Sequence, residues 1–90
     1  LPDVQDVIDG IIASKIAAHS IDIAHGVAHA ERIDFEMSKA RSNLDWNKMF
    51  SYSMNPEKAK KLRGNIKGDY CSMCGEFCSI KINKEYRKKI

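Results

Sequence analysis

The chain has 90 residues, of which 43% are hydrophobic and 30% are charged, and its formal net charge is +3. This composition is too apolar for a disordered tail, and the absence of any apolar run of about 18 residues excludes a membrane span. The length predicts one small domain or a piece of a larger protein. Because the chain begins at Leu1 without a basic and apolar leader, we expect a fragment whose upstream part is missing.

Charge is distributed unevenly along the chain. Residues 1–57 carry nine acidic and five basic side chains, whereas residues 58–90 carry three acidic and ten basic ones. A basic segment is typical of nucleic-acid binding, of anion binding or of a solvated helix face. Aromatic residues do not alternate with these bases, so we favour the solvated helix and expect no nucleic-acid partner. The bases of that exposed helix are Lys58, Lys60, Lys61 and Arg63.

The first predicted element is a helix from Asp3 to Gly26. Asp3 is suited to cap its first turn, and Gly26 is a natural residue to end it. Apolar residues recur at helical spacing over this stretch and form a wide band, which predicts a helix that packs on more than one side. The band consists of Val4, Val7, Ile8, Ile11, Ile12, Ile16, Ala17, Ala18, Ile21, Ile23 and Ala24.

The second predicted helix runs from residue 28 to residue 47. Its expected inward-facing residues are Ile33, Met37, Ala40, Leu44 and Trp46. A third, short helix begins at Asn55-Pro56 and ends at Gly64. Residues 80–90 are charged and fit either a final helix or a loose tail. Since no alternating strand pattern is present, we predict an all-α fold, a small antiparallel helical domain with a cysteine-rich loop.

The cysteines are confined to one short segment. Cys71, Cys74 and Cys78 lie within eight residues, and the rest of the chain has none. An odd number of cysteines at this spacing is a poor disulfide framework and is typical of metal binding inside the cell. We therefore expect a cytoplasmic protein. Gly75 lies between the second and third cysteines and frees the backbone to turn around a bound centre.

The cysteine spacing alone leaves three interpretations open. A structural zinc site would need a fourth ligand, for which His19, His25 and His29 are the candidates. Buried inert thiols are a second interpretation. A 4Fe–4S cluster is the third, in which three thiolates leave one iron open to chelate S-adenosylmethionine.

The surrounding residues are similar to the C-terminal end of the phosphomethylpyrimidine synthase family, radical enzymes that make the pyrimidine half of thiamine. The matching segments are in order and cover nearly the whole chain. They include Gly10-Ile11-Ile12-Ala13, Lys15-Ile16-Ala17-Ala18-His19, Met37-Ser38-Lys39-Ala40-Arg41, Asp45-Trp46, Asn55-Pro56-Glu57 and Cys71-Ser72-Met73-Cys74-Gly75 with Phe77-Cys78.

This resemblance implies a carbon–carbon lyase that converts 5-aminoimidazole ribotide to hydroxymethylpyrimidine phosphate with S-adenosylmethionine and a 4Fe–4S cluster. Family members are homodimers in which a (βα)8 barrel precedes a small helical cluster domain. On this pattern residues 1–26 are the last barrel helix and residues 27–90 are the cluster domain. Cys71, Cys74 and Cys78 are the implied cluster ligands, and this segment holds no other catalytic residue. The fragment is therefore not expected to be active alone.

Two features qualify the resemblance. The family spacing is Cys-x2-Cys-x4-Cys, whereas the gap between Cys74 and Cys78 is one residue shorter. This leaves open a related enzyme that makes hydroxybenzimidazole from the same substrate, and a non-catalytic zinc-binding module is the alternative from another class. In addition, the family binds a divalent metal, zinc or iron, through barrel residues that would lie upstream of Leu1.

Overall fold

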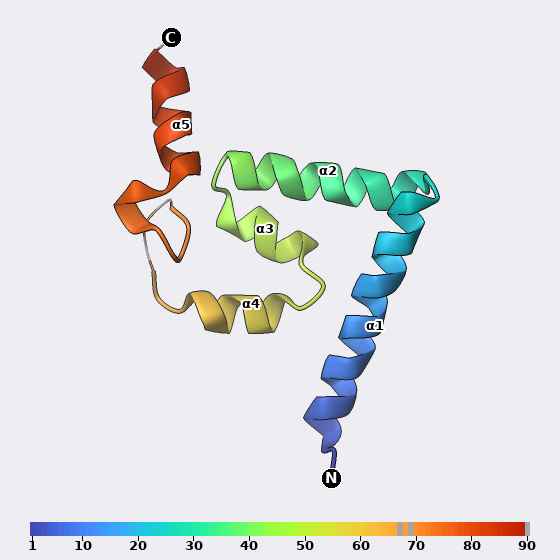
Figure 1. Ribbon diagram of the computed structural model, residues 1–90. Helices are drawn as coiled ribbons and strands as arrows, with labels where there is room; N and C mark the ends of the chain where they lie inside the picture. Colours follow the sequence, from blue (N-terminus) through green and yellow to red (C-terminus); the bar gives the residue numbers. More distant parts are fainter. Residues whose placement is uncertain (67, 69, 90) are drawn as a thin grey trace. The chain divides into compact units, whose positions relative to one another are not determined.

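The computed structural model describes residues 1–66, 68 and 70–89 of the chain. It divides into two compact units, Leu1–Phe35 and Glu36–Ile90. Within the described ranges the regular structure is helical and contains no strand, which confirms the all-α prediction (Figure 1). None of the described helices is both long and apolar enough to cross a membrane. The predicted boundary after residue 26 rested on the family architecture and stays a prediction.

Unit 1 is dominated by α1 (Val4–Ala24), the helix that was predicted from Asp3 to Gly26. Its first turn is closed by a reciprocal cap, in which the Asp6 N–H donates to Asp3 Oδ1 at 2.8 Å and the Asp3 N–H donates to Asp6 Oδ2 at 3.0 Å. Gly26 lies beyond the end of α1 with φ of +73°, a conformation that favours glycine.

No residue of α1 is buried in this chain, so the predicted packing of its apolar band stays a prediction. Val7, Ile8 and Ile11 are all exposed. Within unit 1, α1 is joined to α2 (Ala28–Ser42) by His19, whose Nε2 lies 2.9 Å from Asp34 Oδ1.

Unit 2 corrects the second predicted helix, which was expected to continue to residue 47. The chain leaves the helix after Ser42, and Leu44 takes a left-handed conformation with φ of +54°. Asp45 then accepts the Lys48 N–H at 3.2 Å and caps a new helix, α3 (Trp46–Tyr52). A short polar side chain that satisfies a free helix N–H competes with continued helix, which is the physical reason for the break.

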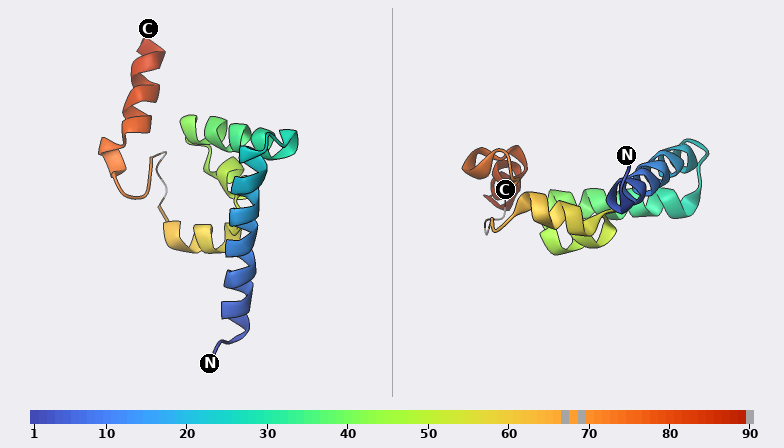
Figure 2. Two further views of the ribbon diagram at one scale, coloured as in Figure 1. Left: turned by 45° about the vertical axis from the view of Figure 1, so that its right-hand side comes forward. Right: turned by 90° about the horizontal axis from the view of Figure 1, so that it is seen from below.

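The third predicted helix is confirmed as α4 (Pro56–Arg63), which lies beside α3 (Figures 1 and 2). The Asn55 side chain accepts the Lys58 N–H at 3.3 Å, and Gly64 ends the helix with φ of +67°. The small core of this unit contains Ala40, Leu44, Met49 and Cys78. Of the residues predicted to face inward, Ile33, Met37 and Trp46 are only half-buried.

The charged C-terminal stretch forms a helix rather than a loose tail. α5 (Ser79–Lys89) follows the cysteine loop directly, after the short 3-10 turn η1 (Gly75–Phe77). The Lys84 ammonium donates to the Asn43 carbonyl at 2.8 Å, which ties α5 to the end of α2 within unit 2. The cysteine loop lies between α4 and α5 in the sequence, and this contact restrains the helix that follows the loop.

Candidate functional site

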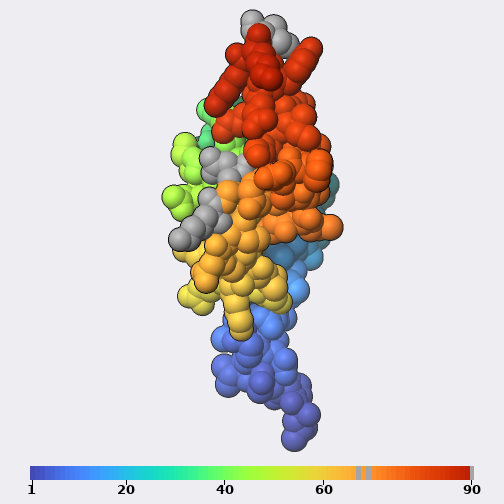
Figure 3. All heavy atoms as spheres, turned by 90° about the vertical axis from the view of Figure 1, so that its left-hand side faces the viewer, coloured from blue at the N-terminus to red at the C-terminus, as the bar shows by residue number. Residues whose placement is uncertain are grey.

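The candidate site is the cysteine loop, residues 71–78, which lies at the surface of unit 2 with α5 (orange and red in Figure 3). Cys71, Cys74 and Cys78 are all free thiols. They differ in their surroundings, since Cys74 is exposed, Cys71 is half-buried and Cys78 is only 1% exposed. One eight-residue loop therefore presents three thiols that differ in their exposure to solvent.

Cys71 and Cys74 interact directly. The Cys74 N–H donates to Cys71 Sγ at 3.3 Å. This backbone hydrogen bond, with further ones from the Cys74 thiol and the Met73 N–H, lowers the pKa of Cys71 to about 7. The same thiol–thiol contact raises the pKa of Cys74, because its proton is held by Cys71 and because a second thiolate would be repelled. Cys71 is thus the most readily ionised of this pair.

The backbone between Cys74 and Cys78 turns tightly. Gly75 has φ of +55°, and the Phe77 and Cys78 N–H groups donate to the Cys74 and Gly75 carbonyls, each at 3.1 Å. The Cys78 carbonyl accepts the Ile82 N–H at 3.0 Å and so begins α5. Gly75 allows this turn, since a side chain at this φ would be strained, while the predicted turn around a bound centre stays a prediction.

Two apolar residues of the loop point into solvent. Met73 is 95% exposed and Phe77 is 84% exposed. An exposed methionine and phenylalanine beside three thiols form an apolar rim around the loop.

The donor set fits a thiolate-bound centre. Three unpaired soft ligands lie on one turn, and one of them ionises near neutral pH. In residues 1–66, 68 and 70–89, no three side chains of His, Cys, Asp or Glu are already gathered closely enough to hold a metal ion. The loop therefore offers three thiol ligands close together in the sequence, but the described side chains are not yet arranged around a metal position.

The histidines proposed for a zinc site have contacts within unit 1. His19 bonds to Asp34, as described above, and His29 Nδ1 lies 2.9 Å from the Arg32 guanidinium. His25 follows α1 as its C-terminal cap residue. Of the residues in these contacts, only Asp34 has a side chain that can bind zinc together with a histidine. A structural zinc site usually needs four ligands.

Arg63 is a residue beside the cysteine loop whose burial was not predicted from the sequence. It was predicted to lie on an exposed helix face, but it is only 8% exposed, whereas Lys58, Lys60 and Lys61 are exposed as predicted. Its guanidinium carbon lies 3.6 Å from the centre of the Trp46 ring. A Lys-Lys-Leu-Arg run reads as a solvated face, and nothing in the sequence separates this arginine from its neighbours.

A cavity of about 330 Å³ adjoins Cys71. Its lining is mostly apolar and comes from α2, α3, α4, α5 and the loops between them, including the cysteine loop. The lining residues are Met37, Arg41, Leu44, Trp46, Met49, Phe50, Ser53, Ala59, Cys71 and Ile80. An apolar neighbourhood limits the access of water to a ligand sulfur, which is one of the ways in which a protein tunes a metal centre.

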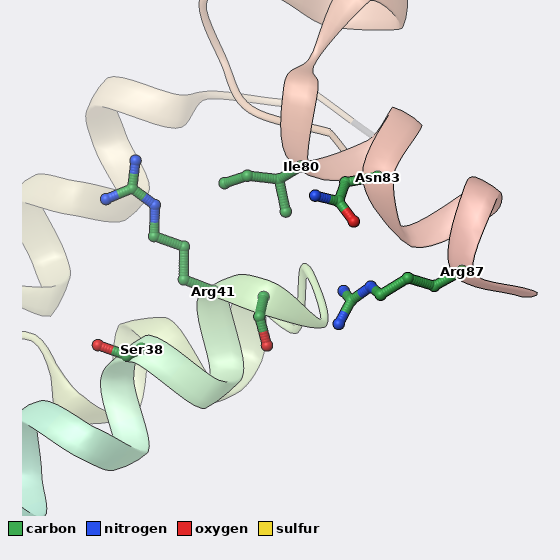
Figure 4. Close-up of a pocket in the computed structure, with 6 residues that line it drawn as sticks. Ser38, Arg41, Ile80, Asn83 and Arg87 are labelled. Atoms are coloured by element: carbon green, nitrogen blue, oxygen red, sulfur yellow. The ribbon is translucent and has the colours of Figure 1, made fainter.

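A second, more polar hollow of about 510 Å³ lies between α2 and α5. Figure 4 shows Asn83 and Arg87 projecting from α5 toward α2, and Arg41 projecting from α2. The two guanidinium groups do not point toward one another in this view. The hollow is thus a polar groove without converging charges.

Comparison with known proteins gives a consistent result. The model of the Radical SAM ThiC family matches residues 1–85. Phosphomethylpyrimidine synthase from Caldanaerobacter subterraneus subsp. tengcongensis is 52% identical over 89 residues, which are 96% of this chain and 21% of that protein. The enzymes of the same name from Geobacter metallireducens and Archaeoglobus fulgidus are 48% and 51% identical, over 99% and 94% of this chain and 21% of each relative.

The chain spans about a fifth of the length of these curated relatives. The match runs through the cysteine loop, since the family model covers residues 1–85 and the loop ends at Cys78. Both the resemblance in the sequence and these matches lead to one assignment, and the chain belongs to the Radical SAM ThiC family.

Proposed function

We propose that this chain is the cluster-binding part of a phosphomethylpyrimidine synthase, which converts 5-aminoimidazole ribotide to hydroxymethylpyrimidine phosphate by radical S-adenosylmethionine chemistry. The observation that carries the proposal is the presence of three free thiols on one turn, in a chain that matches a radical SAM family over residues 1–85. The complete protein would be a cytoplasmic carbon–carbon lyase of thiamine biosynthesis.

In this proposal Cys71, Cys74 and Cys78 each bind one iron of a 4Fe–4S cluster. When bound, the cluster would supply the electron that cleaves S-adenosylmethionine at its open iron. The lowered pKa of Cys71 supports its role as a thiolate ligand, and burial of Cys78 supports a rigid attachment on the α5 side. The apolar cavity beside Cys71 supports a site from which water is largely excluded.

The remaining parts of the enzyme would lie outside this chain. A small-molecule substrate, a divalent metal and the residues that bind them are assigned to a preceding barrel, and α1 to its last helix. The cluster domain would serve the neighbouring subunit of a homodimer. The exposed apolar residues of α1 support a packing partner beyond unit 1.

Anaerobic reconstitution of the chain with iron and sulfide tests the proposal. We expect a brown protein with a broad visible absorption band and about four irons per chain, as for a cysteine-ligated 4Fe–4S cluster. A colourless protein that instead binds one equivalent of zinc would support a zinc-binding module and contradict the proposal.

Alanine substitution of each cysteine tests the ligand set. Cys71→Ala, Cys74→Ala and Cys78→Ala should each lose the cluster, because a three-thiolate site has no spare ligand. In a complete enzyme, each should also abolish S-adenosylmethionine cleavage while substrate still binds. The matched control is Glu76→Gln, an exposed residue of the same loop that should leave iron content unchanged. Normal iron content in any alanine variant would remove that cysteine from the ligand set.

A further inference from the structure

We propose that Arg63 is a positioning residue that fixes the backbone on both sides of Cys71 and shapes the cluster loop before a cluster binds. The inference rests on the proposed function, in which Cys71 is a cluster ligand. It goes beyond that function because it assigns a basic residue of α4, outside the cysteine motif, to the geometry of the site.

The contacts of Arg63 bracket Cys71. Its Nη1 donates to the Tyr70 carbonyl at 3.1 Å and to Ser72 Oγ at 2.9 Å, so the residues immediately before and after Cys71 share one nitrogen. Its Nη2 donates to the Gly68 carbonyl at 2.7 Å. The planar fork of a guanidinium holds several acceptors in a fixed relative geometry, which a flexible ammonium does not.

The other side of the guanidinium rests on the ring of Trp46, 3.6 Å from its centre. Trp46 is the first residue of α3, and it also lines the cavity beside Cys71. Arg63 therefore connects three parts of unit 2, namely α3, α4 and the segment that leads into the cysteine loop. Movement of α3 relative to α4 would break the contact with Trp46, and movement of the loop segment would break the hydrogen bonds.

The burial of Arg63 indicates that these contacts are needed together. A charged group that is nearly buried is costly unless its donors are satisfied. No carboxylate pairs with Arg63 in the ranges 1–66, 68 and 70–89. Backbone carbonyls, one hydroxyl and an aromatic face compensate the charge instead, so the loop conformation is what stabilises the arginine, and the arginine in turn restrains the loop.

The charge itself has a second consequence for a bound cluster. A cluster held by thiolates carries negative charge, which increases on reduction, and a nearby cation favours the reduced form. Ser72 and Tyr70 are the sequence neighbours of Cys71, and both are in contact with the guanidinium. Loss of the charge at this position should therefore shift the cluster potential to a more negative value.

Three substitutions separate geometry from charge. Arg63→Lys keeps the charge but loses the fork, whereas Arg63→Gln loses the charge and most of the hydrogen bonds. Lys61→Gln is the control, because it removes the same charge from an exposed position of the same helix. Ser72→Ala removes one acceptor and leaves Arg63 on its ring, which keeps the proposal testable if the Arg63 variants fail to fold.

The first measurement is amide hydrogen exchange at Cys74 and Gly75 in the metal-free 90-residue chain, because their N–H groups donate to Cys71 Sγ at 3.3 Å and to the Cys71 carbonyl at 3.4 Å. We expect exchange at least about tenfold faster in Arg63→Lys and Arg63→Gln and about threefold faster in Ser72→Ala, in line with the loss of several or one hydrogen bond. Lys61→Gln should match the parent chain. Unchanged exchange in Ser72→Ala, or in a folded Arg63 variant, would overturn the proposal.

The second measurement is the midpoint potential of the reconstituted cluster, together with its electron paramagnetic resonance spectrum. Arg63→Gln should shift the potential to a more negative value and alter the spectrum, and Lys61→Gln should do neither. Identical potentials and spectra in Arg63→Gln and Lys61→Gln would overturn the electrostatic part. If the parent chain forms no cluster, the proposed function fails, while the exchange measurement on the metal-free chain still decides the positioning role.

Discussion

At the residue scale, the three thiols of the loop are chemically distinct although they occur in one short motif. Hydrogen bonds from its neighbours lower the pKa of Cys71 to about 7, while the pKa of Cys74 is raised. Cys78 is almost fully buried and begins the hydrogen bonding of α5. The largest cause of the lowered pKa of Cys71 is the 3.3 Å hydrogen bond from the Cys74 N–H to Cys71 Sγ, whereas the thiol–thiol contact with Cys71 raises the pKa of Cys74.

Thiol alkylation of the reduced, metal-free chain should reveal this difference. Because the thiolate is the nucleophile, Cys71 should react at its half-maximal rate near its pKa of about 7, and its reaction should slow as the pH falls further. Cys74 should require a higher pH, since its pKa is raised. The measurement is iodoacetamide labelling followed by peptide mass spectrometry across a pH series. Identical pH profiles for the two cysteines would contradict the assignment.

At the element scale, the loop is short and its turn depends on one glycine. η1 covers Gly75–Phe77, and the left-handed φ of +55° at Gly75 turns the chain from Cys74 toward Cys78. The spacing between these cysteines is one residue shorter than the family spacing described above. Since Cys78 is anchored on α5, any change of length must be absorbed on the Cys74 side of the turn.

Changes in loop length should therefore be asymmetric in their effect. Inserting one glycine between Gly75 and Phe77 restores the usual family spacing, and we expect the variant to retain iron after reconstitution. Deleting Glu76 shortens the turn and should lose most of the iron, because the thiols are then held too close to the Gly75 turn. Iron content per chain is the measurement, and Glu76→Gln is the control for loss of the carboxylate charge. Equal iron content in the insertion and deletion variants would contradict this view of the loop.

At the scale of the whole molecule, the two units differ in how they bury apolar residues. Unit 2 has a small core around Ala40, Leu44 and Met49, whereas α1 has no buried residue. Apolar side chains at helical spacing on an exposed helix are a surface for association. The same band was read from the sequence as a packing face, and its exposure is consistent with a partner other than unit 1.

The isolated chain should therefore self-associate. Ile11 is 53% exposed on α1, and Ile11→Lys should shift the chain toward monomer because it places a charge within the apolar band. Gln5→Lys is the control, since it adds the same charge at an exposed polar position of the same helix. Sedimentation velocity over a concentration series measures the effect. A parent chain that is monomeric and melts cooperatively would refute this prediction.

Much of the fold follows from local signals in the sequence. Asp3 and Asn55 cap α1 and α4 as predicted, and Gly26 and Gly64 follow the ends of those helices. These are interactions between residues three or four positions apart, so the sequence contains both partners side by side. The cysteine loop, the all-α class and the family assignment were likewise readable from short motifs.

The tertiary structure decided the features that depend on distant partners. Leu44 was expected inside a continuous helix, and the structure instead buries it in a left-handed conformation just before the Asp45 cap of α3. The burial of Arg63 requires Trp46 on one side and Gly68, Tyr70 and Ser72 on the other. Trp46 is 17 positions away in the sequence, and the other three are 5 to 9 positions away. Residue type and spacing determine which helices form and which ligands are available. Long-range packing decides which basic residue is buried, because burial depends on neighbours that the local sequence does not contain.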